Sequence, residues 1–61
     1  MYLIRPITEI AKQWVKDNVN LEPWQWLGRA FAVDHHCVGD LVEGMIGSGL
    51  AVDVDFAVEH A

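Results

Sequence analysis

The stretch "RAFAVDHHCVGDLVEGMIGSGL", residues 29–50, changes its hydrophobic period at its centre. Before Asp34 the residues alternate, with Phe31 and Val33 on one side, which predicts a strand over 29–34. From residue 37 onward apolar residues recur every four positions, which predicts a helix. The two rows are Cys37, Leu41, Met45 and Val38, Val42, Ile46. Asp34, or one of the two histidines after it, is expected to end the strand and cap this helix.

Glycines mark the end of the same helix. Gly49 followed by the apolar Leu50 predicts a Schellman ending in which Leu50 touches Met45. The run "GMIGSG" (44–49) follows a helix, whereas phosphate-binding glycines precede one, so we interpret it as a cap. Gly39 and Gly44 each cost up to about 1 kcal/mol inside a helix. We expect them to allow tight packing within the fold, with a contact between chains as the alternative.

The flanking segments predict three further elements. "YLIR" (2–5) indicates a short strand that Pro6 closes. Thr8 is expected to cap an amphipathic helix over 9–18 whose apolar side is Ile7, Ile10, Ala11, Trp14 and Val15. "NLEPWQWLG" (20–28) indicates a connector. "AVDVDFAV" (51–58) alternates again and predicts a strand with Val52, Val54, Phe56 and Val58 inward.

These elements give the order β-α-β-α-β in one small domain over residues 1–61. A strand, a helix and a strand with short joins favour a right-handed parallel crossover. One-sided alternation indicates a sheet that is covered on one face. We therefore expect an α/β fold, with a small α+β fold as the alternative. It would have a three-stranded sheet and two helices on one face, and the direction of the first strand is open.

Composition narrows the class of protein. Apolar residues make up 52% of the chain, which argues against disorder. The single cysteine cannot form an intrachain disulfide, which favours a reducing, cytoplasmic setting. "MYLIRPITEI" has no basic segment followed by a long apolar run, so we expect no signal peptide. No stretch approaches the roughly 20 apolar residues that span a bilayer, so we expect a soluble protein without membrane contact.

The charges are divided unevenly along the chain. The net charge is −5, and all four basic residues lie within residues 1–29. Residues 30–61 hold six acids and no Lys or Arg: Asp34, Asp40, Glu43, Asp53, Asp55 and Glu59. Direct binding to nucleic acid is disfavoured, because it requires clustered cations. A protein partner with a basic surface is favoured.

No group of residues predicts catalysis. In "DHHC" (34–37), adjacent side chains diverge on a strand or a helix, so we expect no metal site there. Cys37 lies in the row of Leu41 and Met45, which predicts a buried, structural thiol rather than a nucleophile. No acid–base pair or cofactor loop was found. We therefore expect a protein that is not an enzyme and has no cofactor.

Two kinds of residue are candidates for contact with a partner. Trp24 and Trp26 are separated by one residue, so an extended "PWQW" would direct both rings the same way. They would either close the core or form a binding hot spot. Among the acids, Asp40 and Glu43 are expected on the outer side of the second helix, and Asp53 and Asp55 on the uncovered sheet face. The acids are either a solvated surface or part of the same interface.

The segments "LIRPITEIAKQWV" and "AVDHHCVGDLVEGMIGSGL" resemble short uncharacterised proteins of phages and prophages. This resemblance implies a small acidic module in the host cytoplasm that binds and inhibits a host factor or a defence complex without catalysis. The alternative is a self-associating structural or accessory protein without a host target. A homodimer is also expected, through a sheet face that carries Ala30, Ala32, Ala51 and Ala57.

Overall fold

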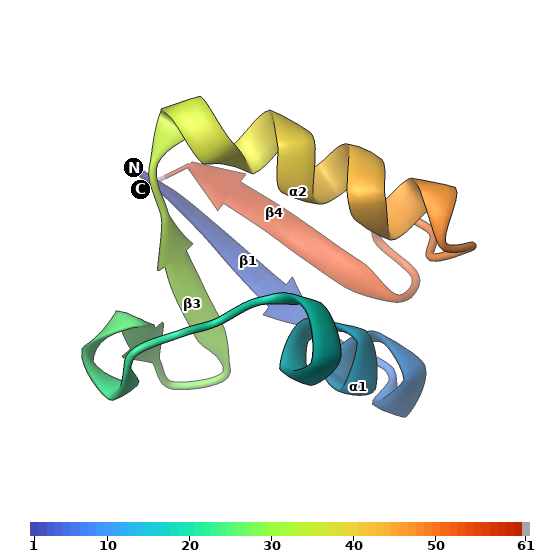
Figure 1. Cartoon of the computed structure of the whole chain (residues 1–61), viewed down its shortest axis with the longest axis horizontal. Helices are drawn as coiled ribbons and strands as arrows, with labels where there is room; N and C mark the ends of the chain where they lie inside the picture. The colour runs from blue at the N-terminus through green and yellow to red at the C-terminus, as the bar shows by residue number, and fades with distance from the viewer. Residues whose placement is uncertain (61) are drawn as a thin grey trace.

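The first strand, β1 (Tyr2–Pro6), lies inside a four-stranded sheet in the computed structural model of the chain, which describes residues 1–60. Its neighbours are β3 (Ala30–Val33) and β4 (Phe56–His60), and both run antiparallel to it. The two-residue strand β2 (Trp26–Leu27) pairs with β3 and completes the order β2-β3-β1-β4. Together with two helices this makes a small α+β fold (Figure 1).

The sheet differs in two ways from the expected one. It has four strands rather than three, because the end of the 20–28 connector pairs with β3 as Trp26↔Phe31 and Leu27↔Ala30. The expected crossover from β3 through α2 to β4 does join two parallel strands of one sheet, but these strands are not neighbours. Both strands are antiparallel to β1, so they share a direction, but β1 lies between them and forms both ladders. The α/β expectation therefore gives way to α+β.

The helix α1 (Glu9–Asn18) has the bounds that the sequence predicts. Thr8 caps it, because its hydroxyl accepts a hydrogen bond from Ala11 N over 3.2 Å. Ala11 and Val15 are buried, as expected. The expected apolar side was too broad, since Ile10 is 72% exposed at the margin of the contact with the sheet.

The helix α2 (His35–Gly47) begins two residues before the periodic rows, because Asp34 caps it and accepts a hydrogen bond from His36 N over 2.9 Å. Its predicted ending is confirmed. Gly49 has φ 94°, Gly49 N donates to Ile46 O over 2.9 Å, and Leu50 N donates to Met45 O over 3.0 Å. This is the Schellman pattern, and Met45 and Leu50 are both buried.

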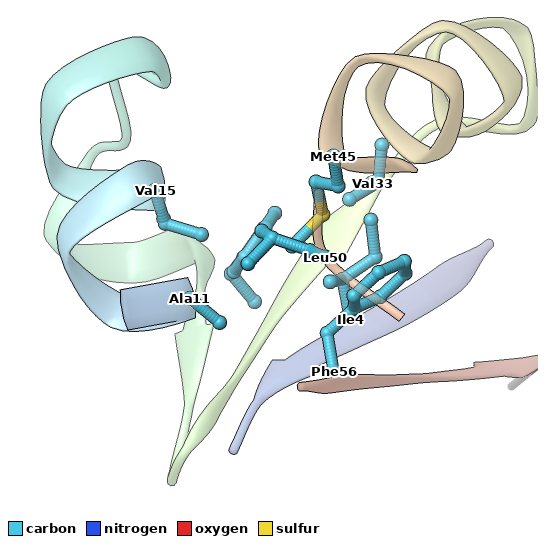
Figure 2. Close-up of a cluster of buried hydrophobic side chains, with 8 residues drawn as sticks. Ile4, Ala11, Val15, Val33, Met45, Leu50 and Phe56 are labelled. Atoms are coloured by element: carbon cyan, nitrogen blue, oxygen red, sulfur yellow. The ribbon is translucent and has the colours of Figure 1, made fainter. Parts of the chain in front are cut away.

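Both helices cover the same face of the sheet, as expected. Their side chains meet the inward residues of β1, β3 and β4 in one apolar cluster (Figure 2). The buried members are Ile4, Ala11, Val15, Phe31, Val33, Met45, Leu50 and Phe56. A hydrogen bond also joins α1 to the residue that caps the end of α2, since Trp14 Nε1 donates to Ser48 Oγ over 2.8 Å. Within residues 1–60, no helix lies on the opposite face of the sheet.

Two expectations for the interior of α2 need correction. Cys37 is exposed rather than buried, because the side of α2 that faces the core is formed by Val38, Leu41, Val42 and Met45. Gly39 also packs against nothing, since a Cβ there would meet no atom within 4 Å. The expectation holds for Gly44, where a Cβ would lie 3.4 Å from the ring of Trp14.

The expected strand over 51–58 is wrong in its first half. Residues 51–55 form a turn, in which Asp55 N donates to Ala51 O over 2.8 Å and Asp53 has φ 65°. Val52 and Val54 were expected inward, and they are 43% and 63% exposed. The chain pairs with β1 only from Phe56, so β4 begins there, and it ends at His60.

Candidate interaction surfaces

The structure does not gather the predicted contact residues into one site. Trp24 lies in the 3₁₀ helix η1 (Pro23–Gln25), and Trp26 follows in β2. Asp40 and Glu43 lie on α2, whereas Asp53 and Asp55 belong to the turn before β4. The predicted placement of Asp53 and Asp55 on the sheet face is therefore wrong.

Trp24 and Trp26 do not point the same way, because η1 replaces the extended conformation that the spacing assumed. Trp26 is opposite the buried Phe31, and the two ring centroids lie 5.4 Å apart at an interplanar angle of 67°. Its ring is 39% exposed and extends the core at the sheet edge. Trp24 is 76% exposed and stands free of the core. Of the pair, Trp24 has the surface for a partner contact.

A shallow cavity of about 340 Å³ lies beside Trp24. Its lining is mainly apolar, with an acid at the rim: Met1, Trp24, Gln25, Ala32, Val33, Asp34 and His35. The pKa of Asp34 lies below its usual value, first because its carboxylate accepts the hydrogen bond from His36 N, and then because of the charges of His36, His35 and the chain amino terminus. Asp34 thus places a carboxylate beside the exposed indole.

The carboxylates of Asp40 and Glu43 lie on the solvent side of α2, as predicted. They are three residues apart on a helix, which makes them neighbours on its surface. Neither forms an ion pair with another residue of the 1–60 segment. They are available to a basic group from outside.

Asp55, unlike the other candidate acids, has a structural role. It is half-buried, and both of its carboxylate oxygens accept hydrogen bonds within the fold. Thr8 Oγ1 donates to Oδ1 over 2.9 Å, and Ala51 N donates to Oδ2 over 2.8 Å. We therefore remove Asp55 from the contact residues and assign it to the structure of the turn. Asp53 stays exposed at the tip of the same turn.

The ligand atoms of Asp34, His35 and His36 lie within 4.8 Å of one another, closer than the sequence suggested for adjacent residues. The side chains are all exposed, and the Asp34 carboxylate already caps α2. We assign Asp34 the capping role.

Cys37 lies at the edge of a second cavity, of about 220 Å³, between α2 and the segment that follows α1. Phe31, Leu21 and Leu41 form apolar parts of its wall. No base contacts the thiol through a hydrogen bond or an ion pair among residues 1–60. The exposure of the thiol corrects the expected burial.

Sequence reasoning missed two features of these surfaces. Met1 and His35 border the cavity at Trp24, and no local pattern links the start of the chain with residues 24–35. The pairing Tyr2↔Val33 brings them together. The exposed Leu27 was also missed, because a strand of only two residues has no alternation that could show which face its residues take.

No protein-family model matches the chain, and no similar protein was found among curated proteins or solved structures. None of the helices within residues 1–60 combines the length and the apolar character that a membrane span requires.

Proposed function

We propose that the chain is a small protein-interaction module that binds a basic surface of another protein and acts without catalysis. The observation that carries this proposal is the exposed pair Asp40 and Glu43 on α2. These acids belong to a half of the chain that has no Lys or Arg, and neither forms an ion pair with a residue of the 1–60 segment. Unpaired surface charges of one sign accelerate encounter with an oppositely charged partner.

Trp24 supplies the contact in this proposal. Large aromatic side chains dominate the binding energy of protein interfaces when a partner desolvates them. Trp24 is the most exposed large apolar side chain of residues 1–60 and borders an apolar cavity with Asp34 at its rim. A basic side chain of the partner would find both a ring face and a carboxylate there. Trp26 is excluded from this role because its ring packs on Phe31.

The kind of partner that we propose is a host factor or a defence complex, which the module would inhibit by covering its basic surface. The resemblance to short phage and prophage proteins supports this choice. In that setting the protein would act in the host cytoplasm. Self-association alone is the alternative function.

A quantitative capture experiment from a bacterial lysate tests the proposal. The bait proteins are the wild type, Asp40→Asn with Glu43→Gln, Trp24→Ala, and a control with Glu9→Gln and Asp17→Asn. The control removes the same amount of charge from the exposed side of α1. We expect a stoichiometric basic protein with the wild type and the control, and reduced recovery with the other two baits. Recovery of only the bait itself would favour the alternative.

A further inference from the structure

The uncovered face of the sheet, opposite the two helices, presents a defined set of side chains. Residues paired across strands share a face, so the pairs Leu27↔Ala30, Ala32↔Leu3 and Leu3↔Glu59 identify it, together with Arg5↔Ala57. This open sheet face consists of Leu3, Arg5, Leu27, Ala30, Ala32, Ala57 and Glu59.

Most of this surface is apolar. Leu27 is 56% exposed, and Leu3 and the three alanines are half-buried. Met1, at 64% exposure, and Trp24 border the Ala32 side of the face. Since two sheets pack about 10 Å apart, short side chains let a second flat apolar layer come close.

The charges of the face are self-complementary. It has one base, Arg5 on β1, and one acid, Glu59 on β4, while the whole chain has a net charge of −5. Arg5 pairs with Ala57 and Glu59 pairs with Leu3, so the two charges stand on neighbouring strands two residues apart. Both side chains are exposed, and neither forms an ion pair with any residue in the described 1–60 range.

We propose that the open sheet face binds the open sheet face of a second copy of this chain. A two-fold axis parallel to the face and perpendicular to the line from Arg5 to Glu59 lays Arg5 of each copy over Glu59 of the other. One symmetry operation thus forms both ion pairs. It also covers Leu3 on both copies.

This contact is compatible with the proposed function and does not depend on it. Asp40 and Glu43 face solvent on α2, and α2 covers the other side of the sheet. A dimer through the open face therefore leaves Asp40 and Glu43 of both copies free, while Ala32 places the cavity beside Trp24 at the edge of the contact. If the capture experiment finds no partner, the dimer proposal is unaffected. If the chain proves to be a monomer, each chain still has its proposed partner site.

Charge reversal at the two positions tests the contact. Arg5→Glu and Glu59→Arg each place like charges opposite one another, and each is expected to weaken self-association at least about tenfold. Lys12→Glu is the control for Arg5→Glu, because it makes the same change of charge on α1, away from the open face. Sedimentation equilibrium gives the dissociation constants, and circular dichroism checks that each variant folds.

Mixing the two charge-reversed proteins separates contacts between chains from contacts within one chain. Arg5→Glu has two acids at these positions and Glu59→Arg has two bases, so a mixed dimer contains both ion pairs again. We expect the equimolar mixture to dimerise with an affinity within about threefold of the wild type. If Arg5→Glu does not fold, Arg5→Gln replaces it, and it is expected to weaken the dimer less than the charge reversal would.

Three results would overturn the proposal. They are a wild-type chain that stays monomeric at high micromolar concentration, a dimer that Arg5→Glu weakens no more than Lys12→Glu does, and a mixture that stays as weak as its components.

Discussion

The hydroxyl of Thr8 donates a hydrogen bond to Asp55 Oδ1 over 2.9 Å and thereby joins the start of α1 to the turn before β4. The same hydroxyl accepts the capping bond from Ala11 N. The backbone reinforces the contact, since Ile7 N donates to Asp55 O over 2.7 Å. This long-range junction explains why an acid in an otherwise exposed turn is half-buried.

Asp55→Ala is expected to lower the free energy of unfolding by about 2–4 kcal/mol, because the Thr8 hydroxyl and Ala51 N lose their acceptors. Asp40→Ala, which removes an acid from the exposed side of α2, should change it by no more than about 0.5 kcal/mol. Urea titrations of both variants measure the difference. If both variants lose the same free energy of unfolding, Asp55 has no structural role beyond that of an exposed acid.

Asp34 should make stability depend on pH in the acid range. Its folded pKa is lowered, so its stabilisation is present above the unfolded aspartate pKa of about 3.9 and disappears as pH falls through the folded value. Asp34→Asn keeps a capping oxygen and removes the charge. The difference in stability between wild type and variant should therefore be constant near neutral pH and shrink in acid. A difference that does not change with pH in urea titrations contradicts this.

Gly39 within α2 and Gly49 just after it should respond in opposite directions to alanine. Gly39→Ala is expected to stabilise the fold by about 0.5–1 kcal/mol, because the position is helical and a Cβ meets nothing within 4 Å. Gly49→Ala should cost about 1–2 kcal/mol, because its φ of 94° is unfavourable for a side chain. Thermal unfolding measures both. A loss of stability in Gly39→Ala would contradict this, because it would mean that a Cβ at position 39 does meet a packing constraint.

The tryptophans should separate stability from binding. Trp26→Ala is expected to cost about 1–3 kcal/mol of stability, because its ring packs on Phe31. Trp24→Ala should leave stability within about 0.5 kcal/mol and raise the dissociation rate of the partner, at a cost on the order of 2 kcal/mol. Urea titration and surface plasmon resonance make the two measurements. A destabilised Trp24→Ala with unchanged binding would reverse the assignment.

Features set by neighbouring residues could be predicted from the sequence. The caps at Thr8 and Asp34 depend on short polar side chains beside apolar periodicity, and the Schellman ending depends on Gly49 and Leu50. The switch from strand to helix after Val33 follows from the change of period. These contacts span only a few residues, so the local pattern contains the information that fixes them.

Features set by distant contacts could not be predicted. Residues 51–55 alternate like a strand, but Asp55 bonds to Thr8 and Ala51, which holds a turn there. The position of β1 between β3 and β4 comes from its two ladders and from nothing local. Cys37 belongs to a valid periodic row, but the core contacts α2 along a line that leaves it outside.

The same division applies to the candidate site. The exposure of Asp40 and Glu43 follows from the helical period and was predicted. The separation of Trp24 from Trp26 depends on η1, which replaced the extended conformation that a spacing of two suggests. The cavity beside Trp24 joins the first residue of the chain to residues 24–35, and only the sheet brings them together.

The salt dependence of the association rate with the captured basic partner tests the central proposal most directly. Asp40→Asn with Glu43→Gln should lower this rate several-fold at low salt and flatten its dependence on ionic strength, because screening beyond about 8 Å at physiological salt already weakens the steering. The control with Glu9→Gln and Asp17→Asn has the same net charge as the Asp40→Asn, Glu43→Gln variant, but its association rate should stay closer to that of the wild type. Equal rates for the acid-to-amide variant and the wild type at every salt concentration would contradict recognition through the acidic side of α2.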